Sequence, residues 1–166
     1  DFCSILRNNI SKSKLITLED ELKFLEQYVY LYQMRYPKNI GYSFQIEEPL
    51  RQIEIPKFSL QPLIENYFAH GIDFRRINNA ISVSVYKENK ELKIVIADNG
   101  KGMDQDLMLK INQYLINDKE FETDSIGIKN VNERLKIIFG TNYQMTFKET
   151  IYGGVTVIIS IVLDEE

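Results

Sequence analysis

Apolar residues recur with helical spacing near the start of the chain. Four- and three-residue steps alternate between Leu18, Leu22, Leu25, Val29 and Tyr32. This stripe predicts an amphipathic helix over residues 17–35 with heptad character. Thr17, followed by Asp20, predicts a capped first turn, and Pro37 predicts the end. Two interpretations are open: a helix packed on its own domain, or a coiled-coil-like stem leading to a partner.

Further along, apolar and polar residues alternate as in strands. The predicted strands are 41–46, 81–86, 91–97, 143–147 and 155–161, and the nearly all-apolar segment 91–97 is expected at the centre of a sheet. Helical spacing predicts helices from near Pro56 or Pro62 to Ala69, over 107–115 and over 128–138, the last closed by Gly140. Residues 104–125 are mostly polar and fit a mobile lid.

The order of these elements predicts an α+β fold, a two-layer α/β sandwich whose mixed sheet is covered on one face by helices. We place a boundary near residues 36–40. Residues 1–36 would form a helical stem, and residues 37–166 would form the α/β body.

Composition excludes some classes of function. A chain of 166 residues can bury one sizeable core. The net charge of −4 and the pI near 5.2 argue against a nucleic-acid partner. No apolar run approaches the ~20 residues that span a bilayer, and no signal peptide opens the chain. Because the chain opens on Asp1, we expect a fragment of a longer protein, with any membrane anchor upstream. The single cysteine, Cys3, cannot form an internal disulfide.

Three polar stretches follow one another along the body. They are Gln61-Pro62-Leu63-Ile64-Glu65-Asn66 running to His70-Gly71, Asp98-Asn99-Gly100-Lys101-Gly102-Met103, and Gly127-Ile128-Lys129-Asn130-Val131. Together they resemble the N, G1 and G2 boxes of the ATP-binding domain shared by histidine kinases, gyrase-type ATPases and mismatch-repair ATPases. The resemblance implies a Bergerat-type fold with ATP and Mg²⁺ as ligands.

The residue types suit these ligands. An Asn oxygen is a neutral, hard ligand for Mg²⁺, and a spacing of four would place Pro62, Asn66 and His70 on one helix face. Asp98 ends a strand, where its carboxylate can accept the exocyclic amine of adenine. Gly127 at a helix start would leave N–H groups facing a triphosphate. Structural alternatives exist: a loop contact for Asn66, a helix-end role for His70, and an ordinary Asp-Asn-Gly turn at Asp98.

The first and third stretches resemble most closely the LytS/YesM-like sensor histidine kinases. By that resemblance Asn66 holds Mg²⁺, Asp98 binds adenine, and Gly100 and Gly102 shape the pocket. Lys129 and the Gly127 backbone approach the phosphates. The resemblance also implies that other residues of the boxes contact the nucleotide, namely His70, Met103, Ile128 and Asn130. Gly154 and Thr156 resemble the last small box of the pocket, which makes Thr156 a further expected contact.

The chain departs from the family pattern in two ways. Ser125 stands where the G2 box usually begins with glycine, and the His-Phe-rich phospho-acceptor motif is missing. His70, the only histidine, lies inside the nucleotide motif and is not expected to be the acceptor. Pro62 replaces the Glu with which gyrase-type ATPases activate water, so the site favours phosphoryl transfer to a protein. Glu65, beside Asn66, is either a catalytic assistant to the transfer or a structural residue.

The function predicted on this basis is that of the catalytic domain of a sensor histidine kinase, which transfers the ATP γ-phosphate to a histidine outside this chain. Implied partners are the phospho-acceptor helix of the parent, a response regulator and a second copy of the full-length protein. The location implied is cytoplasmic, with membrane contact only through upstream segments. Two alternatives are a serine-directed kinase of the anti-sigma-factor type and a degenerate nucleotide-binding module without transfer activity.

Overall fold

A five-stranded mixed sheet forms one layer of the molecule. In this computed structural model, residues 15–36, 40–122, 126–151 and 153–164 are described. The strands β2 (Ile40–Ile46), β4 (Asn79–Glu88), β5 (Glu91–Asp98), β7 (Val155–Val162) and β6 (Tyr143–Glu149) lie in that order across the sheet. β2 pairs with β4 in parallel, and the other neighbours are antiparallel. β5 therefore occupies the central place that its apolar sequence predicted.

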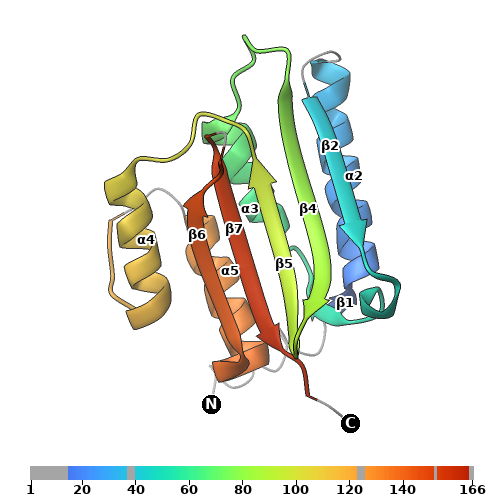
Figure 1. Cartoon of the computed structure of the whole chain (residues 1–166), viewed down its shortest axis with the longest axis vertical. Coiled ribbons are helices and arrows are strands. Elements are labelled where there is room, and N and C mark those ends of the chain that lie inside the picture. The colour runs from blue at the N-terminus through green and yellow to red at the C-terminus, as the bar shows by residue number, and fades with distance from the viewer. Residues whose placement is uncertain (1–14, 37–39, 123–125, 152, 165–166) are drawn as a thin grey trace.

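Helices cover one face of this sheet (Figure 1). They are α2 (Leu18–Arg35), α3 (Gln61–Asn66), the π-helix η2 (Tyr67–Gly71) and α5 (Ile126–Phe139), while α4 (Gln105–Asn117) lies beside the edge strand β6. The core between the layers includes Leu25, Ile64, Ile94, Leu135 and Ile159. The predicted α+β architecture is confirmed.

The first helix packs on the body of the domain. Its N-cap residue Thr17 accepts a hydrogen bond from the amide of Asp20 at 3.2 Å, as the sequence predicted. Its apolar stripe, from Leu18 to Val29, belongs to the same core as the sheet. Of the two interpretations of this helix, the structure shows packing on its own domain. The part of the expected stem that precedes residue 15 lies outside the described residues.

Several short elements were not predicted. Strands β1 (Leu15–Thr17) and β3 (Glu54–Pro56) pair antiparallel, and the 3₁₀ helices η1 (Glu48–Leu50) and η3 (Gly140–Asn142) fill connections. α3 begins at the second of the two proline-marked starts. Much of the expected lid, 104–125, is α4, which buries Ile111, Tyr114 and Leu115. No helix within the described residues is long and apolar enough to span a membrane.

Candidate nucleotide site

The first polar stretch ends in a π-turn. The amide of Ile72 donates to the carbonyl of Tyr67 at 2.8 Å, which widens the last turn of this helix by one residue. Asn66, Tyr67 and His70 all line one cavity. Pro62, which was expected on the same helix face as Asn66, is not among the lining residues and lies close to Gly127 of α5.

The second polar stretch is joined directly to the end of the first. The amide of Lys101 donates to the carbonyl of Gly71 at 2.7 Å. A Cβ on Gly100 would lie 2.3 Å from that carbonyl oxygen, closer than any side chain tolerates. Glycine at position 100 therefore allows the two stretches to form adjoining walls of one cavity.

Asp98 stands at the end of β5 with its carboxylate largely buried. Oδ1 accepts the amides of Gly100 at 2.9 Å and Val155 at 3.2 Å. Burial raises the pKa of Asp98, and these two hydrogen bonds partly oppose the rise. A Cβ on Gly154 would lie 2.2 Å from the Asp98 carbonyl oxygen, so glycine lets the start of β7 pass close to this carboxylate.

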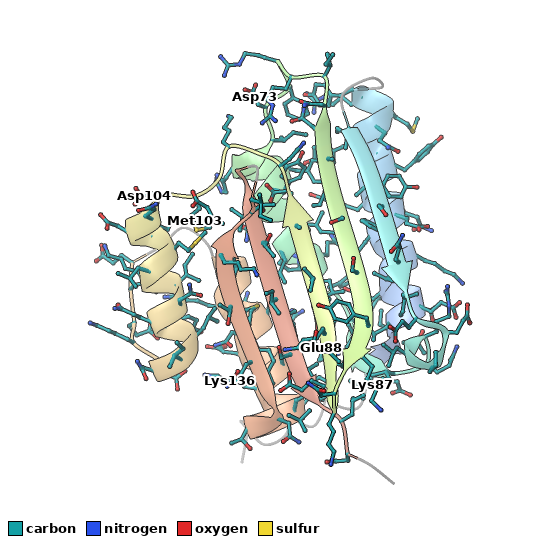
Figure 2. All side chains as sticks on the ribbon, in the orientation of Figure 1. Asp73, Lys87, Glu88, Met103, Asp104 and Lys136 are labelled. Carbon is teal, nitrogen blue, oxygen red and sulfur yellow. The ribbon has the colours of Figure 1, made fainter. Side chains whose placement is uncertain are left out.

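These segments enclose a cavity of about 450 Å³, a size typical of small-ligand and cofactor sites. Met103 and Asp104 lie on its α4 side (Figure 2). Its lining residues are Leu63, Asn66, Tyr67, His70, Gly71, Ile96, Asp98, Gly102, Met103, Asp104, Leu107, Glu122, Phe147, Val155 and Val157. The cavity thus combines a largely apolar lining with a few polar groups, the composition that suits a purine base.

Two polar atoms on the α3–η2 wall lack partners among the described residues. They are Nδ2 of Asn66 and the hydroxyl of Tyr67, both buried. Buried polar groups are normally hydrogen-bonded, so an unpaired amide here fits a site that a ligand completes. The two ends of an amide are interchangeable by a flip, so Asn66 can donate to a phosphate oxygen or offer an oxygen to Mg²⁺. No cluster of three or more His, Cys, Asp or Glu side chains suited to a metal occurs in the described ranges.

The third polar stretch does not reach the cavity in this structure. Ile128 is fully buried in the core, and Asn130 is exposed. A Cβ on Gly127 would lie 3.1 Å from Pro62 Cβ, so this glycine allows α5 to pack closely on α3. None of these residues, nor Lys129, is among the lining side chains, so the phosphate contacts that the resemblance implied stay a prediction.

Lys129 points toward the segment after α4. Its Nζ lies 3.0 Å from Glu120 Oε2 and donates to the carbonyl of Phe121 at 3.0 Å. The same ammonium group lies over the rings of Tyr114 and Phe121. Ser125, whose effect on the third stretch was an open question, lies outside the described residues.

Two further predicted site residues lie off the cavity. The Thr156 hydroxyl is 2.9 Å from that of Thr150, because strand alternation turns Val155 and Val157 toward the cavity instead. Glu65 is exposed and accepts a hydrogen bond from Gln61 at 3.0 Å. The apolar lining, including Leu107 and Phe147, carries no motif signal and was not found from the sequence.

Comparison with known proteins shows similarity to histidine kinases. A family model described as histidine kinase matches residues 1–40. The sensor protein LytS of Oceanobacillus iheyensis is 30% identical over 145 residues, which cover 87% of this chain and 25% of that protein. LytS of Staphylococcus haemolyticus is 34% identical over 149 residues, 89% of this chain and 25% of that protein. The chain thus spans about a quarter of the length of these relatives.

Solved structures share the fold at low sequence identity. The catalytic domain of the histidine kinase ThkA aligns with a TM-score of 0.65 at 12% identity, covering 92% of this chain and 97% of that one. The Acinetobacter baumannii histidine kinase AdeS aligns with a TM-score of 0.61 at 9% identity, covering 96% and 74%. The chain is therefore similar to LytS sensor proteins over most of its own length, and it has the fold of solved histidine kinase catalytic domains.

Proposed function

We propose that this chain binds Mg²⁺ and ATP in the cavity between α3–η2 and β5, as the catalytic domain of a sensor histidine kinase. The observation that carries the proposal is the convergence of Asn66 and Asp98, from two separate motifs, on the walls of one cavity of about 450 Å³. Asp98 would accept the exocyclic amine of adenine, and the Asn66 side chain would hold Mg²⁺ beside the phosphates.

The chain's own residues would act by positioning and by neutralising charge. Transfer of a phosphoryl group depends mainly on those two effects. Pro62 cannot activate water and is not among the residues that line the cavity, which favours a protein acceptor over hydrolysis. The acceptor would be a histidine on a helix of the parent protein, and a response regulator would be the next partner. As in sensor kinases, the parent would be a dimer and this domain would lie in the cytosol.

A second candidate is a nucleotide-binding module without transfer activity. It is favoured by the position of Lys129, whose ammonium group is held by Glu120 and not directed at the cavity. Mixing the chain with ATP and a protein that carries the upstream histidine helix separates the two candidates. The kinase labels that helix, and the binding module does not.

Replacing Asn66 by alanine tests the proposed metal site. We expect the wild-type chain to bind ATP more tightly with Mg²⁺ than without it, and Asn66→Ala to lose much of that difference because a neutral oxygen ligand is gone. Calorimetric titration of both proteins with and without Mg²⁺ is the measurement. Equal metal dependence in the two proteins would remove Asn66 from this role.

A further inference from the structure

A buried carboxylate outside the cavity holds the segment that leads into α3. Glu21, in the first turns of α2, has no exposed surface. Its Oε2 accepts the amide of Phe58 at 3.0 Å, and its Oε1 accepts the amide of Leu60 at 3.1 Å. Burial raises the pKa of Glu21, while these amides, the Gln61 amide and Lys57 act in the opposite direction. Fully buried glutamates are uncommon unless their charge is satisfied, as it is here by backbone amides.

The Leu60 amide belongs to the N-cap residue of α3, and the Phe58 amide lies two residues earlier. The N-cap residue is Leu60, whose side chain cannot accept the unpaired amides at the start of a helix. Glu21 supplies, from a different helix, an acceptor for the amide of this N-cap residue. Asn66 is the last residue of this short helix, so the same rigid segment joins the contact with Glu21 to the cavity.

Other contacts hold the same turn. Phe58 has a left-handed backbone with φ of 63°, which is unusual for a bulky residue and needs support from its surroundings. The Lys57 ammonium group lies 5.0 Å from the centre of the Phe58 ring, and Arg134 of α5 donates to the Lys57 carbonyl at 3.3 Å. Just before the turn, β3 pairs with β1, the strand that leads into α2.

We propose that Glu21 is a positioning residue of the nucleotide site: its carboxylate fixes the start of α3 to α2, and thereby sets the placement of Asn66 in the cavity. The inference rests on the proposed function, since it concerns the same ATP site. It also makes α2 and β1 a direct route by which a change in the preceding part of the protein would reach the metal-binding side chain.

The variant Glu21→Gln tests the inference. The amide keeps the size of the side chain but presents NH₂ to a backbone N–H, so one of the two hydrogen bonds is lost. Glu19→Gln is the matched control, because Glu19 is on the same helix but contacts Arg51 and Gln52, which lie outside the cavity. We expect Glu21→Gln to weaken Mg·ATP binding roughly three- to tenfold, the range of coupled remote positions, and Glu19→Gln to leave it unchanged.

The decisive readout is the ratio of ATP affinities with and without Mg²⁺. A carboxylate that only stabilises the fold would lower the melting temperature and leave this ratio at its wild-type value, and that result overturns the inference. A wild-type chain that binds no ATP overturns the proposed function, and this inference with it. A wild-type chain that binds ATP, with an unchanged ratio in Glu21→Gln, overturns the inference alone.

Hydrogen exchange of the wild-type chain decides the matter if Glu21→Gln does not fold. Coupling is reciprocal, so Mg·ATP should slow exchange of the Phe58 and Leu60 amides. The control is the Lys87 amide, which donates a hydrogen bond of 3.2 Å to Glu47. Neither residue lines the cavity, so this amide should exchange at the same rate with and without Mg·ATP. Unaltered exchange at Phe58 and Leu60 under saturating Mg·ATP would show that the turn and the site are independent.

Discussion

Asp98 carries a burial cost that a ligand would offset. The hydrogen bonds that it accepts both end on Oδ1 and come from backbone amides, and burial raises its pKa from the ordinary value of 3.8. The Asp98 carboxyl group therefore holds its proton more tightly in the folded protein than in the unfolded chain. The stability contributed by Asp98 is greatest below pH 3.8 and falls as the pH rises through the raised pKa.

The variant Asp98→Asn should separate ligand binding from stability. An amide can still accept the two backbone hydrogen bonds but carries no charge to desolvate. We expect the nucleotide-free variant to be more stable than wild type at neutral pH, and the difference to shrink toward pH 4 as the Asp98 carboxylate takes up a proton. Chemical denaturation at both pH values measures this.

ATP affinity of the same variant should move in the opposite direction. Loss of a charge-assisted hydrogen bond costs ~1.5–3 kcal/mol, or roughly ten- to a hundredfold in affinity. The preference for ATP over GTP should narrow, because an amide can also donate to the guanine oxygen. A folded variant with wild-type affinity and wild-type discrimination would make Asp98 a turn residue.

Gly100 and Gly140 offer a matched pair of substitutions. A methyl group at Gly100 meets the Gly71 carbonyl at 2.3 Å, whereas Gly140 has φ of 56° and open space around it. Alanine at either position should destabilise the fold by ~1–3 kcal/mol, through crowding at one and backbone strain at the other. Only Gly100→Ala should also weaken ATP binding. If Gly140→Ala weakens it equally, the loss reflects stability and not the cavity wall.

At the scale of elements, long periodic segments were predictable and short ones were not. The apolar stripe from Leu18 to Tyr32 predicted α2, and the apolar patterns in 81–86 and 91–97 predicted β4 and β5. Strands β1 and β3 have three residues each, too few for a period, and form because they pair with each other. The Lys129–Glu120 ion pair and the π-turn at Tyr67–Gly71 depend on three-dimensional contacts that no sequence pattern displays.

In α4, one polar side chain adds an anchor to the packing of the buried residues. Asn112 donates to the Phe147 carbonyl at 2.8 Å and accepts the Phe147 amide at 2.9 Å, which fastens the helix to the edge of β6. Polarity alone had suggested a lid over this region. The anchor is invisible in the sequence because an Asn on a helix is usually solvated.

Asn112→Ala should release α4 from β6. Both hydrogen bonds are lost and the Phe147 backbone is left unpaired, which should cost ~1–3 kcal/mol in the free energy of unfolding. Hydrogen exchange of residues 105–117 should quicken, and Lys110→Ala, at an exposed position of the same helix, should have little effect. Equal exchange in the two variants would mean that the buried residues Ile111 and Tyr114 hold the helix without help.

At the scale of the whole molecule, we expect the chain to catalyse phosphoryl transfer from ATP without carrying the acceptor itself. Its only histidine, His70, lies on the cavity wall. Radiolabelled ATP should therefore leave this chain unlabelled and should label an added protein that carries the upstream histidine helix. Acid-labile label on His70 would contradict the expectation, and His70→Gln provides the control for any label observed.

The contact between Gly71 and Gly100, and that between Gly154 and Asp98, also limit how such a domain can be re-engineered. Three loops distant in sequence touch backbone to backbone at these points, with no side chain between them that could adapt. A loop transplanted from a related domain would bring a different backbone conformation into a space bounded by the other two loops. Chimeric domains should therefore function when the three loops are exchanged as a set, and single-loop exchanges should require a compensating change elsewhere.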